Sequence, residues 1–271
     1  VKGFRTTDGA GVKLVRVLGN LTTKEFDPIL MLDSFDSINP DDYTAGFPMH
    51  PHRGIETISY VSRGKMVHRD SLGNEAGISD GEVQWMNSGS GIMHEEMVPA
   101  AERLLGVQLW LNLPAKDKMS KPSYNSIKNE DIKEIEIEGG KIRLLAGKYG
   151  EHEGYKGDYL SMDYYDIHLN ADAEVTLTME EDDSVMVFTL LGDVYIDGEH
   201  IEEKTAVKLT EGDSLTIKNG NEKAQVLYMN SRALNEPVAW AGPIVMNTQE
   251  ELQKAFLELR SNTFIKETAE Y

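Results

Sequence analysis

Cysteine is entirely absent from this sequence of 271 residues. Without thiols the chain forms no disulfides, offers no thiolate metal ligand and has no cysteine nucleophile. Any bound metal must therefore be held by nitrogen and oxygen atoms. Long apolar runs are also lacking, because none reaches the roughly 20 residues that a membrane helix needs. The first 19 residues are polar and interrupted by glycine, without a signal-peptide core, so we expect a cytoplasmic protein.

Basic residues are scarce relative to acidic ones. The chain has 27 Lys and Arg against 46 Asp and Glu, which gives a formal net charge of -19. A field of this sign repels the phosphate backbone of nucleic acids, and no stripe of basic and aromatic residues counteracts it. We therefore expect no direct binding to nucleic acid and attribute the acidity mainly to solubility.

Short runs of β-branched and alternating residues, bounded by Gly, Asp and Asn, recur through the chain and predict an all-β fold. The predicted strands are residues 55–62, 82–87, 104–113, 184–192, 193–198, 206–212, 214–220 and 224–230. The pair Asp197-Gly198 is typical of a two-residue hairpin turn. Asp80-Gly81 and Glu211-Gly212 indicate similar turns in front of strands.

An internal repeat indicates two similar barrels in tandem. Residues 60–67 align with residues 188–195, and residues 80–85 align with residues 211–216 at nearly the same distance along the chain. We predict two β-barrel domains, residues 1–125 and 126–271. Residues 114–131 are polar, contain two prolines and are interpreted as a surface linker.

One helix is predicted near the C-terminus, over residues 248–262, with Asn247 or Thr248 as its N-cap. Its apolar stripe consists of four residues at helical spacing: Leu252, Ala255, Phe256 and Leu259. We place this helix in the second domain, expect the stripe to pack on a barrel and assign the helix no chemistry.

Two short motifs indicate a metal site. His50 and His52 are two residues apart, so in an extended segment both imidazoles leave the same face. His94 and Glu96 repeat this spacing. Two such strands side by side would offer three nitrogen ligands and one oxygen ligand, and we predict that they hold one divalent metal ion. Glu56 shares the parity of His50 and His52, so it is open whether Glu56 or Glu96 supplies the carboxylate.

The other residues of these types have simpler interpretations. Four histidines are interpreted as ordinary core or surface residues: His68, His152, His168 and His200. In the second copy of the repeat the four ligand positions fall on Thr178, Glu180, Gln225 and Leu227, so the predicted site exists once. Arg53 and Gln108 are interpreted either as supporting groups of the site or as surface and barrel-wall residues.

Several segments resemble the cupin superfamily and, in their details, the pirin family. They are HPHRGIETISYV (50–61), DGEVQWMNSGSGIMHEEM (80–97), GVQLWLNLP (106–114), GDVYIDG (192–198) and GPIVMNTQEEL (242–252). Asn87 stands where proline is common in cupins, and four residues rather than two separate Gly89 from His94. Both departures look like pirin features, and the resemblance covers nearly the whole chain.

The resemblance implies two tandem cupin barrels of the double-stranded β-helix or jelly-roll type, with a metal in the N-terminal barrel only. It implies that Glu96 is the carboxylate ligand and that Glu56 is a neighbour. The expected metal is iron, with manganese, nickel, copper or zinc also accommodated. In function the resemblance implies quercetin 2,3-dioxygenase activity or, as in animal pirins, a nuclear cofactor that binds transcription regulators.

The leading hypothesis is oxygen-dependent ring opening of a flavonol such as quercetin, with release of carbon monoxide and with Glu96, or Glu56 beside it, as general base. An apolar wall for a flat ligand is assigned to Met49, Met93, Met97, Trp85 and Trp110. The alternatives are a metal-dependent regulatory protein without turnover and a barrel that binds metal only for stability. The expected partners are a flavonol-like compound and dioxygen, without a membrane, and the expected state is a monomer.

Overall fold

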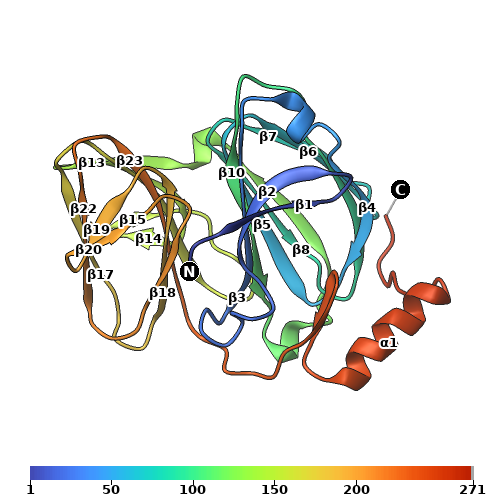
Figure 1. Cartoon of the computed structure of the whole chain (residues 1–271). Coiled ribbons are helices and arrows are strands. Elements are labelled where there is room, and N and C mark those ends of the chain that lie inside the picture. The colour runs from blue at the N-terminus through green and yellow to red at the C-terminus, as the bar shows by residue number, and fades with distance from the viewer. Residues whose placement is uncertain (270–271) are drawn as a thin grey trace. The chain divides into compact units, whose positions relative to one another are not determined.

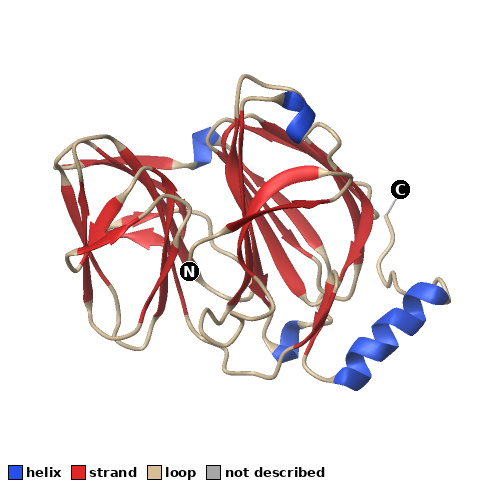
Figure 2. Ribbon diagram, viewed as in Figure 1, coloured by secondary structure: helices blue, strands red, loops and turns tan. Residues whose placement is uncertain are grey.

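Nearly all regular structure in this protein is β-strand (Figures 1 and 2). The computed structural model describes residues 1–269 and divides them into two compact units. The first unit contains Arg5–Thr23, Ile29–Lys128 and the chain from Leu234 onward; the second contains Val1–Phe4, Lys24–Pro28 and Asn129–Ala233. The predicted all-β fold with two barrels and one C-terminal helix is confirmed. None of the helices in residues 1–269 is long and apolar enough to cross a membrane.

The first unit is built from two sheets around an apolar core. The larger sheet contains, in spatial order, β1 (Phe4–Asp8), β2 (Val12–Leu18), β3 (Ile29–Ser37), β10 (Leu104–Asn112), β5 (Ile55–Arg63), β8 (Glu82–Asn87) and β11 (Ser123–Ile127). The smaller sheet contains β4 (Phe47–His52), β9 (Ile92–Met97), β6 (Lys65–Asp70) and β7 (Glu75–Ser79). Single 3₁₀ turns occur at Pro40–Asp42 and Ala115–Asp117. Val12 and Leu14 enter the core while Lys13 is exposed, as the two-residue period of a strand requires.

The second unit repeats this plan. Its larger sheet contains β12 (Lys133–Ile137), β13 (Gly140–Ala146), β16 (Met162–Leu169), β23 (Ala224–Ser231), β18 (Ser184–Leu191) and β21 (Ala206–Leu209). Its smaller sheet contains β17 (Glu174–Thr178), β22 (Ser214–Asn219), β19 (Val194–Ile196) and β20 (Glu199–Ile201). A 3₁₀ turn at Asn129–Asp131 and a small hairpin of β14 (Lys148–Tyr149) and β15 (His152–Glu153) complete the unit. Asp197 and Gly198 join β19 to β20 with φ values of 50° and 78°, which confirms the predicted hairpin turn.

The repeat is confirmed for one of its two aligned segments and wrong for the other. Strands β5 and β18 hold the same place, since each lies between two strands of the larger sheet. Gly81, however, precedes β8, which pairs with β5, whereas Gly212 precedes β22, which pairs with β17 and β19. Acidic-Gly turns recur at several strand connections, so this motif alone did not identify the strand. The counterpart of β9 is therefore β22, with the sequence SLTIKN, and not β23, which carries Gln225 and Leu227.

The C-terminal segment belongs to the first unit, which corrects its predicted place in the second domain. It contains β24 (Ala239–Ala241), β25 (Ile244–Met246) and the helix α1 (Gln249–Arg260). Thr248 is the N-cap of α1 and forms a capping box with Glu251, as the sequence indicates. The apolar stripe of α1 packs on β24, β25 and Phe264, so the helix is held by its neighbours in the chain. Val1–Phe4 likewise joins the second unit rather than the first.

The predicted surface linker also needs correction. Residues 123–127 form β11, which pairs with β8 from Ser123 opposite Asn87 to Ile127 opposite Val83. Ile127 is buried and the rest of the strand is half-buried, so this segment closes the larger sheet of the first unit. Its mixed polar sequence conceals a strand because only one of its side chains needs to enter the core.

Candidate metal centre

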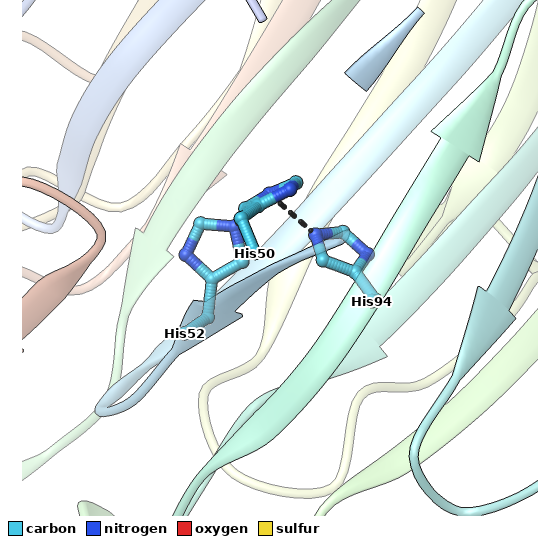
Figure 3. A group of neighbouring side chains, drawn as sticks. All are labelled: His50, His52 and His94. Carbon is cyan, nitrogen blue, oxygen red and sulfur yellow. Dashed lines mark hydrogen bonds between the residues drawn. The ribbon is translucent and has the colours of Figure 1, made fainter. Parts of the chain in front are cut away.

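Three imidazoles meet where β4 and β9 pair in the smaller sheet of the first unit. His50 lies opposite His94 in the register, and His52 follows two residues later on the same face of β4. One ring nitrogen from each of the three lies within 4.8 Å of the others. Figure 3 shows the three side chains side by side, with their rings turned toward one another. His52 and His94 are buried, whereas His50 is partly exposed, so the group is reached by solvent from the His50 side.

The hydrogen bonds of two rings fix where their protons lie. Nδ1 of His50 is 2.8 Å from the carbonyl oxygen of Pro48, and Nδ1 of His52 is 3.0 Å from that of Pro243. A carbonyl only accepts, so each Nδ1 carries the proton and each Nε2 presents a lone pair. These two Nε2 atoms face each other at 3.1 Å. Two lone pairs at this distance repel each other unless a cation lies between them.

A proton does not fill this role near neutral pH. Burial, together with the neighbouring His50, lowers the pKa of His52 to about 3. Burial also lowers the pKa of His94 well below its ordinary value. His52 and His94 are therefore neutral near pH 7, and Nε2 of His94 lies 2.9 Å from Nε2 of His50. Three converging imidazoles without sulfur fit a divalent transition metal such as iron, manganese, nickel, copper or zinc.

The carboxylate of Glu96 is held beside this group by two amides. Glu96 is buried on β9, two residues after His94 and on the same face. Nε2 of Gln108 donates to its two oxygens at 2.9 and 3.2 Å, and Nε2 of Gln84 donates to Oε1. The convergent group itself contains only the three histidines among residues 1–269. Coordination by Glu96 therefore stays a prediction.

Glu56 and Arg53 do not lie where the parity of the sequence places them. Gly54, with φ of 84°, turns the chain between β4 and β5, so Glu56 belongs to the larger sheet, opposite Leu111 and Asn87. Arg53 is buried and donates to the carbonyl oxygens of Ser90 and Phe264 at 2.7 and 2.9 Å. Arg53 thus anchors the C-terminal segment and is not a group of the metal centre.

Of the residues assigned to an apolar wall, Trp110 lies beside the imidazoles, whereas Met49 and Met97 do not face them. Met49 and Met97 alternate with the inward-facing His50 and Glu96, so they lie on the outer face of their strands and are 50% and 40% exposed. The edge of Trp110, by contrast, meets the ring of His52 at a centroid distance of 5.1 Å. Trp240 of the C-terminal segment lies 5.6 Å beyond Trp110 and was not foreseen. The wall beside the imidazoles is therefore aromatic.

Three further contacts of the site were missed because they come from other strands. Gln84 on β8 reaches Glu96, and the carbonyl of Pro243 reaches His52. His68, interpreted as an ordinary histidine, lies on β6 with its Nδ1 3.4 Å from Nδ1 of His94. A local signal exists only for Gln84, as a polar residue inside a strand that is buried throughout.

Comparison with known proteins identifies relatives over almost the full length. A family profile described as Pirin matches residues 11–111, and one described as Pirin C-terminal cupin domain matches residues 164–265. A Pseudomonas aeruginosa protein, named provisionally as a quercetin 2,3-dioxygenase, is 39% identical over 268 residues, which are 95% of this chain and 94% of that protein. Human pirin is 35% identical over 265 residues, which are 94% of this chain and 89% of that protein. A crystal structure of quercetin 2,3-dioxygenase from Acinetobacter baumannii is 30% identical, covers 97% of this chain and 95% of its own, and gives a TM-score of 0.88.

Proposed function

This chain belongs to the pirin family, and on that premise we propose that it is a metal-dependent dioxygenase that opens the ring of a flavonol such as quercetin. The observation that carries the proposal is the group of three imidazoles whose ring nitrogens converge at a partly open place. Two relatives whose names contain quercetin 2,3-dioxygenase support the choice of substrate class.

The proposed ligands are His50, His52, His94 and Glu96, with iron as the leading metal. When bound, such a metal supplies Lewis-acid polarisation of the flavonol 3-oxygen and a redox partner for dioxygen. The buried imidazoles of His52 and His94 exclude water from the inner side. Substrate therefore approaches from the side of the partly exposed His50.

Glu96 is proposed as the general base that takes the proton of the flavonol 3-hydroxyl. Gln84 and Gln108 fix its carboxylate through amide donors, and Oε2, which among residues 1–269 accepts only from Gln108, keeps a further lone pair for a proton. Trp110, which lies edge-on to His52, offers an aromatic surface for the flat substrate. These residues bind, orient and deprotonate the substrate.

The test is oxygen consumption with quercetin after the chain has been stripped and reloaded with iron, manganese, nickel, copper or zinc. His50→Ala and Glu96→Ala should each abolish metal-dependent turnover. Glu180→Ala is the matched control, because position 180 is the counterpart of His52 in the second copy of the repeat, and it should leave turnover unchanged. Metal content of every variant is measured in parallel.

A chain that binds metal but consumes no oxygen with quercetin under any loading would overturn this assignment. The regulatory role without turnover would then be the better proposal. A chain that binds none of the five metals would instead remove the proposed centre itself.

A further inference from the structure

A fourth imidazole, that of His68, contacts His94 on the side away from His50 and His52. His68 is completely buried on β6, and its Nδ1 is 3.4 Å from Nδ1 of His94. Its other nitrogen, Nε2, is 2.7 Å from Oδ2 of Asp70. Asp70, His68 and His94 thus form a hydrogen-bonded row, which ends at the ring nitrogens that converge with His50 and His52.

The carboxylate of Asp70 sets the direction of this row. Burial alone would raise its pKa, but hydrogen bonds from His68 and Asn74 outweigh burial and lower it. Its Oδ1 also accepts from the backbone amides of Leu72 and Asn74 at 2.9 and 3.1 Å. An ionised carboxylate only accepts, so Nε2 of His68 carries a proton. The tautomer of His68 with its proton on Nε2 has its single lone pair at Nδ1, towards His94.

We propose that Asp70 and His68 are a positioning pair that places the proton of His94 on Nδ1 and thereby aims the lone pair of Nε2 at His50 and His52. The inference rests on the proposed metal centre and extends it by one layer of residues. His50 and His52 obtain the same tautomer from backbone carbonyls. At Nδ1 of His94 the described partner is His68 rather than a backbone carbonyl, so His68, held by Asp70, acts as the acceptor.

Tyr124 on β11 fixes the plane of His68. The two rings are stacked, with centroids 4.0 Å apart and an interplanar angle of 15°. Its hydroxyl accepts from Ser126 at 3.1 Å and donates to Oε1 of Gln84 at 3.3 Å. Gln84 in turn donates to Glu96. Tyr124 therefore supports His94 through His68 and the carboxylate of Glu96 through Gln84. The edge strand β11 therefore contributes to the order of the centre although it supplies no ligand.

His68 itself is not a ligand in this arrangement. Both of its nitrogens are engaged, one with Asp70 and one with His94. Loss of the pair should therefore leave three or four ligands in place but remove the preference of His94 for the productive tautomer. The expected effect is a tenfold to hundredfold loss of metal affinity, about the range known for residues that support metal-bound histidines.

The first experiment observes the tautomer in the full-length, unmodified chain. The histidines are labelled with ¹⁵N, metal is removed, and the two ring nitrogens of His94 are assigned by NMR near neutral pH. We expect the proton on Nδ1 and an unprotonated Nε2. A proton on Nε2 of His94 would overturn the inference whether or not any variant folds.

The second experiment measures zinc affinity by competition with a chelator in Asp70→Asn and His68→Gln. His168→Gln is the matched control, because His168 has the same spacing from Asp166 and a similar 2.8 Å bond, in the second unit. We expect weaker binding by tenfold or more in the first two variants and a change below about twofold in the control. Unchanged zinc affinity with an unchanged His94 tautomer in both variants would refute the positioning role. Failure of the unmodified chain to bind zinc would refute the proposed centre, which the tautomer measurement does not test.

Discussion

Each imidazole at the centre has one proton to place, and its neighbours decide on which nitrogen it lies. Carbonyl oxygens of Pro48 and Pro243 hold two of these protons on Nδ1. The lone pairs then point inward, where they would repel one another without a cation. The proposed metal centre thus depends on hydrogen bonds on the outer side of the rings as much as on the ligands themselves.

The amide of Gln108 is expected to orient the carboxylate of Glu96, and this role can be tested by substitution. Gln108→Met keeps the volume but removes the donor to Glu96 and to Ser59 Oγ, at 2.9 Å each. We expect turnover with quercetin to fall about tenfold to a hundredfold while metal content stays at that of the unmodified chain.

A matched change controls for the loss of a buried amide. Gln225 also donates to a buried carboxylate, Oδ1 of Asp166 at 2.9 Å, but in the second unit. Gln225→Met should therefore lower stability without lowering turnover per bound metal. Equal losses of turnover in both variants would show that Gln108 acts only through folding.

Among the elements, the C-terminal segment is the one whose position matters most for the centre. Pro243, directly before β25, supplies the acceptor for His52, and Arg53 forms a parallel bridge with Ile244. Arg53 is also paired with Glu258 of α1 at 2.7 Å and lies over the ring of Phe264 at 4.2 Å. The segment therefore closes one side of the first barrel and orients a proposed ligand.

The ion pair between Arg53 and Glu258 predicts a pH-dependent attachment of α1. Burial would raise the pKa of Glu258, but Arg53 and Lys266 outweigh burial and lower it below the ordinary 4.5. A lowered pKa in the folded state means that the stabilisation is fully present above pH 4.5 and is lost as the pH falls through the folded pKa. Glu258→Gln should reduce the free energy of unfolding by about 1 to 3 kcal/mol near neutral pH.

Denaturant titrations of both chains at several pH values check this expectation. The difference between them should shrink towards zero as the pH falls from 4.5 through the lower folded pKa of Glu258, because the carboxyl is uncharged below that pKa. A difference that stays constant down to the acid transition would show that the charge of Glu258 contributes nothing.

For the whole molecule, the two units have separate cores and only one has the proposed centre. The three tryptophans, Trp85, Trp110 and Trp240, all lie in the first unit. Their fluorescence therefore reports the unfolding of that unit alone. The core of the second unit consists of aliphatic residues and tyrosines from its own strands, so it does not depend on metal.

Metal should consequently stabilise one transition and leave the other unchanged. With zinc at about 100 times its dissociation constant, we expect the tryptophan transition to gain about 2.7 kcal/mol. His50→Ala should abolish this gain. The chelated chain should stay folded, since the first barrel has its own apolar core.

Circular dichroism reports the strands of both units, so the part of its change that does not coincide with the tryptophan transition follows the second unit in the same samples. Equal shifts of both transitions would show that the units unfold as one cooperative body. Unfolding of the first unit on chelation alone would support a metal that serves stability rather than turnover.

Residues close together in the sequence were enough to predict many strands, one turn, the helix cap and the pairing of two histidines. The two-residue period and the β-branched composition identified strands such as β5 and β10, because each must bury one face or both. Asp197-Gly198 and the Thr248 capping box were readable because turn and cap chemistry involve residues only a few positions apart. The proximity of His50 to His52 followed from spacing on one strand.

Only the tertiary structure decided which residues from distant strands meet. The row from Asp70 through His68 to His94, the amides on Glu96 and the carbonyl of Pro243 all depend on strand pairing or on the path of the C-terminal segment. The same holds for the place of Glu56 on the larger sheet, which the chain enters after the turn at Gly54. Sequence period specifies the face on which a side chain lies, whereas its neighbour across the sheet is set by register and closure of the whole barrel.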